Sequence, residues 1–397
     1  MPLTEYGEKS TVRPFSVTTK GQRIKPNTTY MGNICNTVRK PVEKVAVLFA
    51  GLGSAYCGML KEVETYPKAQ AVLQQASDIL GMDIAKLCST GADPKKLEDV
   101  HVAQVVVTVM NLVSVEIMKQ REALLMSQAT IVSGFSVGEF AALYFAGAIS
   151  FEDTLKLVQI QCQEFAKLKE CGTLCNVRGL PRHQVERINK RFNCQIANII
   201  SDHGASKQGG LVEKNVYVCG GKADDIDDLV SHVNELGKKD TKSDLEAGKR
   251  PIISAKKLRV KTANRKLLSR FNEPCQIICL ISTLLLVISD TSLMKPAMAR
   301  FRKTLLSTHI TFPRDHVVYS NVTGRPYTSV KEIRKLLPMQ MVKPVKWHST
   351  ITSIHLEEGC NQFIECGAMR SQSSMVKLIL GDKAGLTFYS SDQKYSD

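Results

Sequence analysis

A serine flanked by glycines is the residue whose neighbours point most directly to chemistry. Gly134, Ser136 and Gly138 form a Gly-x-Ser-x-Gly motif between the apolar run 129–132 and the helix-forming run 139–143. This order of strand, sharp turn and helix is typical of a nucleophile elbow, in which a serine hydroxyl is held at a helix N-terminus. Backbone N–H groups and the helix dipole stabilise negative charge at that position. The motif predicts a serine nucleophile; the alternative interpretation is a glycine-bracketed turn with a solvent-exposed serine.

The elements that position this turn alternate between strands and helices. A buried strand is expected at 45–49, before a Gly-rich turn at 51–53, and helical patterns cover 61–91, 103–124 and 151–169. Such alternation indicates an α/β fold with a mainly parallel sheet. The turn lacks the further glycine of a dinucleotide fingerprint and the Gly-Lys-Ser/Thr of a P-loop, so no nucleotide cofactor is expected.

The pattern changes after residue 172, where shorter elements suggest a small α+β unit inserted in the larger domain. Three strands are expected at 173–178, 195–200 and 216–220, with helices at 181–192 and 223–236. Periodicity is lost over 238–290. Beyond it, we expect helices from 293 and at 330–341, and strands at 317–320 and 362–365.

Charge and composition exclude several classes of protein. The chain has 397 residues, of which 43% are hydrophobic and 23% charged, as in ordinary globular proteins. Its formal net charge is +15. Segment 238–270 contains 12 basic and 3 acidic residues and therefore supplies +9 of that charge. Because the rest is only mildly basic, a nucleic-acid partner is not expected. Binding through 238–270 remains the alternative, and it would show a steep salt dependence.

Cysteine usage and apolar runs bear on metals, membranes and location. The 12 cysteines include no Cys-x-x-Cys pair, so no metal site is expected and a reducing compartment is indicated. The longest apolar run, 277–288, is shorter than the roughly 20 residues of a membrane-spanning helix. Residues 1–43 contain seven basic and three acidic residues and no apolar core, and we interpret them as a leader with a possible targeting role.

Several blocks of the sequence resemble the malonyl-CoA:acyl carrier protein transacylases, most closely the mitochondrial animal type. Segment 134–153 is similar to the family's GHSxGEYAAL…AGxxSFEDA block, and 49–54 is similar to its FPGQGS loop. Further blocks match in the family's order at 292–297, 319–327 and 340–347. The resemblance extends over roughly 45–236 and 291–380.

The resemblance implies an α/β-hydrolase-like large domain with a parallel sheet and an inserted ferredoxin-like α+β subdomain. The implied organisation is a leader at 1–43, the large domain at 44–171 and 291–397, the subdomain at 172–263 and an anomalous insert at 264–290. It also implies malonyl transfer from malonyl-CoA to the phosphopantetheine thiol of acyl carrier protein through a serine acyl-enzyme, which supplies fatty acid synthesis. We therefore expect these two partners, no cofactor, a monomer and a mitochondrial location.

The resemblance assigns roles residue by residue. It makes Ser136 the nucleophile and gives the oxyanion amides to Val137 and Leu52, where a main-chain donor tolerates loss of the family's glutamine side chain. Gln104 corresponds to a buried glutamine of the family. Gln161 stands where the family has an arginine that binds the malonyl carboxylate. A neutral amide cannot neutralise that charge, so the change bears on malonyl selectivity.

The general base is the second departure from the family. The catalytic histidine precedes the block that begins here at Thr291, and Asp290 occupies its position. An unperturbed aspartate, with a pKa of about 4, is a weak base for a hydroxyl. Segment 264–290 stands where the family has a short connection, and we interpret it as translated non-coding sequence such as a retained intron. Sequencing the transcript across this junction tests that interpretation.

These departures leave two other functions open. One is a catalytically inactive homologue that keeps carrier-protein binding. The other is a serine hydrolase that uses His348 or His355 as its base, in the order serine then histidine found in α/β hydrolases.

Overall fold

The computed structural model describes residues 44–99, 101–167, 172–204, 212–240, 253–257, 291–381 and 385–392. The chain divides into the units Met1–Val42 and Glu43–Asp397, and the description below concerns the second. The expected leader, the segment 264–290, Asp290 and most of the basic run 238–270 lie outside the described residues.

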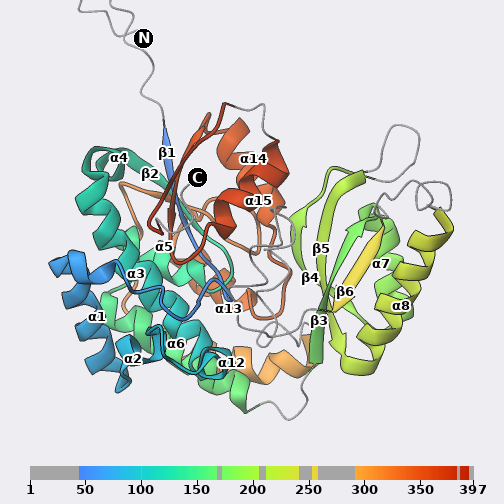
Figure 1. Ribbon diagram of the computed structural model, residues 1–397, viewed down its shortest axis with the longest axis horizontal. Helices are drawn as coiled ribbons and strands as arrows, with labels where there is room; N and C mark the ends of the chain where they lie inside the picture. The colour runs from blue at the N-terminus through green and yellow to red at the C-terminus, as the bar shows by residue number, and fades with distance from the viewer. Residues whose placement is uncertain are drawn as a thin grey trace, which may run out of the picture. The chain divides into compact units, whose positions relative to one another are not determined.

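A parallel sheet forms the centre of the larger half of this unit (Figure 1). Its strand order is β7-β2-β1-β8-β9, and every pairing is parallel. The strands are β1 (Val45–Phe49), β2 (Ala129–Gly134), β7 (Val317–Val318), β8 (Gln362–Cys366) and β9 (Thr387–Ser390). The predicted parallel sheet is confirmed, although β9 was not predicted.

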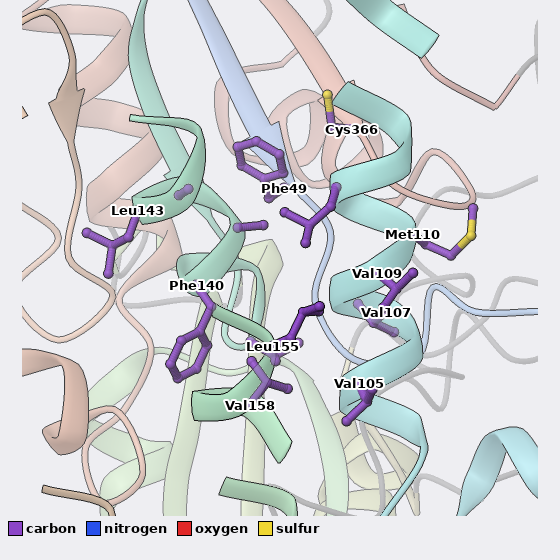
Figure 2. Packing of buried hydrophobic residues seen from close by; sticks show 14 of the residues in the cluster. Phe49, Val105, Val107, Val109, Met110, Phe140, Leu143, Leu155, Val158 and Cys366 are labelled. Carbon is purple, nitrogen blue, oxygen red and sulfur yellow. The ribbon is translucent and has the colours of Figure 1, made fainter. Parts of the chain in front are cut away.

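Side chains of β1 alternate between two hydrophobic clusters, because successive residues of a strand point to opposite faces. Val45, Val47 and Phe49 pack with helices α3 (Ala103–Arg121), α5 (Gly138–Phe145) and α6 (Phe151–Ala166). Figure 2 shows how Phe49 lies among side chains of these helices. Ala46 and Leu48 pack with α14 (Trp347–Leu356) and α15 (Ser371–Leu380). Burial on both faces explains why β1 is a continuous apolar run.

The helical pattern predicted over 61–91 is interrupted in the structure. It contains the 3-10 turn η1 (Val63–Thr65) and the helices α1 (Pro67–Leu80) and α2 (Ile84–Cys88). Proline occupies the first turn of α1, and Gly81 ends that helix with φ 63°. Both residues are typical helix boundaries, so the helical character predicted for this range is divided among three short elements. The pattern predicted at 103–124 is likewise divided between α3 and α4 (Ala123–Gln128).

A second, antiparallel sheet lies between α6 and α12 (Thr291–Ser307) in the chain. Its order is β4-β5-β3-β6, with α7 and α8 packed on one face (Figure 1). The bounds are β3 (Gly172–Gly179), α7 (Arg182–Arg191), β4 (Gln195–Ser201), β5 (Val212–Lys222), α8 (Ala223–Asp240) and β6 (Ser254–Lys257). This βαββαβ arrangement confirms the ferredoxin-like prediction, and β6 is its fourth strand, which the sequence did not predict.

The segment before α14 is joined to the antiparallel sheet by main-chain hydrogen bonds at Val345. Its N–H donates to the Ala197 carbonyl at 3.0 Å, and its carbonyl accepts the Ile199 N–H at 2.9 Å. Val345 immediately precedes α14, whose Trp347 is fully buried in the cluster that also contains Ala197. The segment before α14 therefore pairs with β4 of the antiparallel sheet. In the described part of the chain, no helix is long and apolar enough to cross a membrane.

Candidate active site

The turn between β2 and α5 has the geometry of a nucleophile elbow. Ser136 adopts φ 54°, in the left-handed region that residues with a side chain rarely occupy. A Cβ at Gly134 would lie 2.0 Å from the Gly138 carbonyl oxygen, and one at Gly138 would lie 2.6 Å from the Phe49 carbonyl oxygen. Both glycines are therefore required for the strand, the turn and β1 to approach this closely.

The backbone and side chain of Ser136 have different environments. Its N–H donates to Asn321 Oδ1 at 3.0 Å. Its Oγ has no hydrogen-bond partner within the described ranges, and the residue is 9% exposed. The hydroxyl is therefore not committed to a structural hydrogen bond with those residues.

Two backbone amides near the elbow are available to a ligand. Val137 is the N-cap residue of α5, and Leu52 lies on the turn after β1. That turn packs against the elbow, because a Cβ at Gly51 would lie 2.6 Å from the Phe135 carbonyl oxygen. Neither the Leu52 N–H nor the Val137 N–H has a hydrogen-bond acceptor in the part of the chain that the structure describes. Free N–H groups beside a serine hydroxyl are the donors that an oxyanion requires.

The two glutamines singled out from the sequence form a pair in the structure. Gln161 Nε2 on α6 donates to Gln104 Oε1 on α3 at 2.8 Å, and each residue is 4% exposed. Gln161 Oε1 is buried and has no hydrogen-bond partner in the described part of the chain. The pair is thus neutral and buried, and one acceptor atom has no partner among the described residues.

Neither candidate histidine is a hydrogen-bond partner of Ser136. His348 Nδ1 accepts the Asp202 N–H at 3.1 Å, and burial lowers the pKa of this imidazole. His355 Nδ1 lies 3.2 Å from the Cys360 carbonyl oxygen. No cluster of three or more His, Cys, Asp or Glu side chains suited to a metal occurs among the described residues. Asp290, at the expected base position, lies outside them.

Sequence reasoning missed three residues of this site. Asn321, Glu139 and Tyr327 form a buried hydrogen-bonded group against the elbow. All three lie in blocks whose resemblance to a family was evident, which is the signal that could have drawn attention to them. Their contacts join segments that are far apart in the chain, and spacing alone does not predict such contacts.

Comparisons with known proteins agree on one family. Residues 47–244 match the acyl transferase domain family. A probable mitochondrial malonyl-CoA-acyl carrier protein transacylase of Drosophila melanogaster is 26% identical over 333 residues, which cover 82% of this chain and 77% of the relative. The mouse (Mus musculus) mitochondrial malonyl-CoA-acyl carrier protein transacylase is 29% identical, over 80% of this chain and 73% of the relative.

Solved structures show the same fold. An acyl-carrier-protein S-malonyltransferase from Bartonella henselae superposes with a TM-score of 0.67 at 21% identity, over 88% of this chain and 95% of the other. A malonyl-transacylase solved in complex with a type II polyketide synthase acyl-carrier protein gives 0.65 at 21% identity, over 88% and 96%. The resemblance inferred from the sequence blocks is confirmed.

Proposed function

We propose that this chain, which belongs to the acyl transferase domain family, transfers a malonyl group from malonyl-CoA to the phosphopantetheine thiol of acyl carrier protein. The observation that carries the proposal is the elbow itself: Ser136 adopts φ 54°, and the N–H groups of Val137, the next residue, and of Leu52, on the turn packed against the elbow, have no acceptor among the described residues. The names of the relatives support the choice of donor and acceptor. The proposal includes that the transferred malonyl group supplies fatty acid synthesis.

The reaction follows from the geometry in two displacements. Ser136 Oγ attacks the thioester carbonyl and loses its proton, while the carbonyl oxygen becomes an oxyanion bound by the N–H groups of Leu52 and Val137. Collapse of this intermediate breaks the C–S bond, and the CoA sulfur leaves with a proton. The carrier thiol then attacks the Ser136 ester through the same oxyanion site and releases the serine hydroxyl.

Each displacement needs a group that moves a proton: in the first it accepts the proton of the Ser136 hydroxyl, and in the second it accepts the proton of the carrier thiol and returns one to the Ser136 oxygen. Asp290, at the position of the family histidine, is our candidate. A carboxylate of ordinary pKa is a poor match for a serine hydroxyl near neutral pH. We therefore propose that transfer by this chain is slow.

Gln161 and Gln104 are our candidates for contacts to the malonyl group. Their amides can hydrogen-bond a carboxylate but do not neutralise its charge. Relative to a charge-assisted pair, this weakens recognition by about 1–2 kcal/mol. The proposal includes reduced discrimination between malonyl and uncharged acyl groups.

Location and organisation complete the proposal. Residues 1–43 serve as a mitochondrial leader, and the names of the animal relatives support that location. The chain acts as a monomer without a cofactor of its own. The segment 172–263 is a subdomain of the acyltransferase.

The experiment that tests the function follows malonyl from donor to acceptor. The full chain is incubated with labelled malonyl-CoA, the adduct is mapped by mass spectrometry, and acyl carrier protein carrying phosphopantetheine is then added. We expect an adduct on Ser136, absent from Ser136→Ala, that passes to the carrier. An adduct released by water without transfer would indicate a hydrolase. Carrier binding without any adduct would indicate an inactive homologue.

A further inference from the structure

Asn321 contacts the elbow through every polar atom of its side chain. Its Oδ1 accepts the Ser136 N–H at 3.0 Å, and its Nδ2 donates to the Gly134 carbonyl and to Glu139 Oε2, both at 2.8 Å. Asn321 is 2% exposed and comes from the segment that follows β7. One side chain thus connects the end of β2, the turn and the first turn of α5.

These three contacts also fix the orientation of the amide. If Oδ1 and Nδ2 of Asn321 exchanged places, an oxygen would face the Gly134 carbonyl and the Glu139 carboxylate. The nitrogen would then face the Ser136 N–H, and all three contacts would become repulsive. Only one orientation of Asn321 is compatible with the elbow.

Glu139 and Tyr327 hold Asn321 in that orientation. Glu139 is fully buried, and its Oε1 accepts the Tyr327 hydroxyl at 2.6 Å and the Asn321 N–H at 3.2 Å. Together with the Asn321 Nδ2 contact, the carboxylate receives three donors. A buried carboxylate needs such donors, and a chain of buried hydrogen bonds holds its members rigidly.

We infer that Asn321, held by Glu139 and Tyr327, is a positioning residue that fixes Ser136 in its reactive backbone conformation. A serine backbone at φ 54° is strained and persists only where surrounding contacts hold it in place. The hydrogen bonds of Asn321 provide such contacts for Ser136. Because Asn321 engages the Ser136 N–H, the free donor at the elbow is the N–H of Val137. The inference rests on Ser136 being the nucleophile of the proposed function and is independent of the acyl group.

Asn321→Ala tests this role against a matched buried asparagine. Asn215 is fully buried in the small sheet, where its Oδ1 accepts the His203 N–H and its Nδ2 donates to the carbonyls of Leu180 and Gly204. Asn215→Ala therefore removes the same kind of contacts away from the elbow. We measure reaction of Ser136 with a fluorophosphonate probe and with malonyl-CoA, and hydrogen exchange of the Ser136 amide.

The expected result separates the two variants. In Asn321→Ala, the rate of probe reaction falls by about 10- to 100-fold, since small misplacement of a reacting group costs that much, and the Ser136 amide exchanges faster. The apparent binding constant for malonyl-CoA stays unchanged. In Asn215→Ala, the probe rate and the Ser136 exchange match the wild type, whatever happens to overall stability.

A milder variant keeps the inference testable if Asn321→Ala does not fold. Tyr327→Phe removes one donor to Glu139 and leaves every direct contact of Asn321 in place. Its control is Tyr319→Phe, which loses a buried hydroxyl whose contact, at 3.4 Å, is to Ser353. We expect slower probe reaction only in Tyr327→Phe.

The remaining outcomes distinguish failure of the proposed function from failure of the positioning role of Asn321. If the wild type reacts with the probe but not with malonyl-CoA, while Asn321→Ala slows the probe, the proposed function fails and the positioning role stands. Unchanged probe rates in Asn321→Ala or, where that variant does not fold, in Tyr327→Phe overturn the positioning role. Equal slowing in Asn215→Ala, or a wild type that does not react with the probe at all, overturns it too.

Discussion

The backbone N–H groups around Ser136 differ in whether they can bind an oxyanion. The N–H of Ser136 is bonded to Asn321, whereas the N–H of Val137 is directed to no acceptor among the described residues. Under the proposed function, an oxyanion formed at Ser136 would accept the Val137 N–H at the N-terminus of α5, where the helix dipole adds to the hydrogen bond. We assign the selection of the acyl group to other residues, Gln161 and Gln104.

Replacing Gln161 by arginine tests that assignment. Under the proposed function, Gln161→Arg restores a cation for the malonyl carboxylate, and we expect the ratio of kcat/KM for malonyl-CoA over acetyl-CoA to rise about tenfold or more. The control is Gln163→Arg, which adds the same charge on the exposed face of α6 and leaves the ratio unchanged. An equal ratio in the two variants would remove Gln161 from the acyl site.

Glu139 gives stability and activity opposite dependences on pH. Burial raises its pKa from 4.5 to about 7, while hydrogen bonds from Tyr327 and Asn321 oppose the shift. Between these values the folded state holds a proton that the unfolded state has released, so the free energy of unfolding falls as pH rises through this window. Activity should change in the other direction, because protonated Glu139 accepts fewer donors and holds Asn321 less firmly. Tyr327, in contact with Glu139, stays protonated because its pKa is raised well above its ordinary value.

Denaturant unfolding and initial rates from pH 5 to pH 8 check this prediction. Glu365 is the matched control, because burial also raises its pKa to about 7 and its carboxylate accepts N–H groups of Gln372 and Ser373. Glu139→Gln and Glu365→Gln should each reduce the fall in stability with rising pH. Only Glu139→Gln should alter the pH profile of activity, and an altered profile in Glu365→Gln as well would contradict the argument.

At the scale of elements, the elbow depends on glycines that allow the backbones of β1, β2 and α5 to approach one another closely. A Cβ at Gly138 would lie 2.6 Å and 2.7 Å from the carbonyl oxygens of Phe49 and Ala50. Gly138→Ala should therefore push α5 away from β1 and destabilise the fold by about 1–3 kcal/mol or more. Gly91→Ala is the control, because the added methyl group meets no atom within 4 Å. Midpoints of urea unfolding compare the two, and similar midpoints would show that β1 and α5 do not require contact at Gly138.

Elements that are determined by residues close together in the chain can be predicted from the sequence. Elements that depend on pairing with a distant segment cannot. The elbow was predictable because the glycines, the strand and the helix lie within one short segment. Strand β6 was not, because its Ser-Ala-Lys-Lys sequence has no apolar run and only pairing with β3 makes it a strand. The Asn321 contacts escaped prediction for the same reason, since β7 must first pair with β2 to bring this residue to the elbow.

At the scale of the whole molecule, β6 and α12 are each held by contacts within their own part of the fold. β6 pairs with β3 in the antiparallel sheet, and α12 buries Ala297, Phe301 and Leu305 in the core of the larger half. The described elements that precede and follow the segment 264–290 in the chain, β6 and α12, therefore each have contacts with other described residues. These contacts make it feasible to test, by replacement, our hypothesis that 264–290 is translated non-coding sequence.

Replacing 264–290 by a Phe-His dipeptide should give Ser136 the base that it lacks among the described residues. The family resemblance places an aromatic residue and a histidine before the block that starts at Thr291. General-base catalysis contributes about 10²–10⁴-fold, so we expect Ser136 acylation by malonyl-CoA to accelerate by that order. A Phe-Ala replacement of the same segment is the control and should unfold at the same denaturant midpoint without the acceleration. Equal acylation rates in the two chains would mean that no histidine at this junction reaches Ser136, and a lower midpoint in both would mean that 264–290 contributes to the fold.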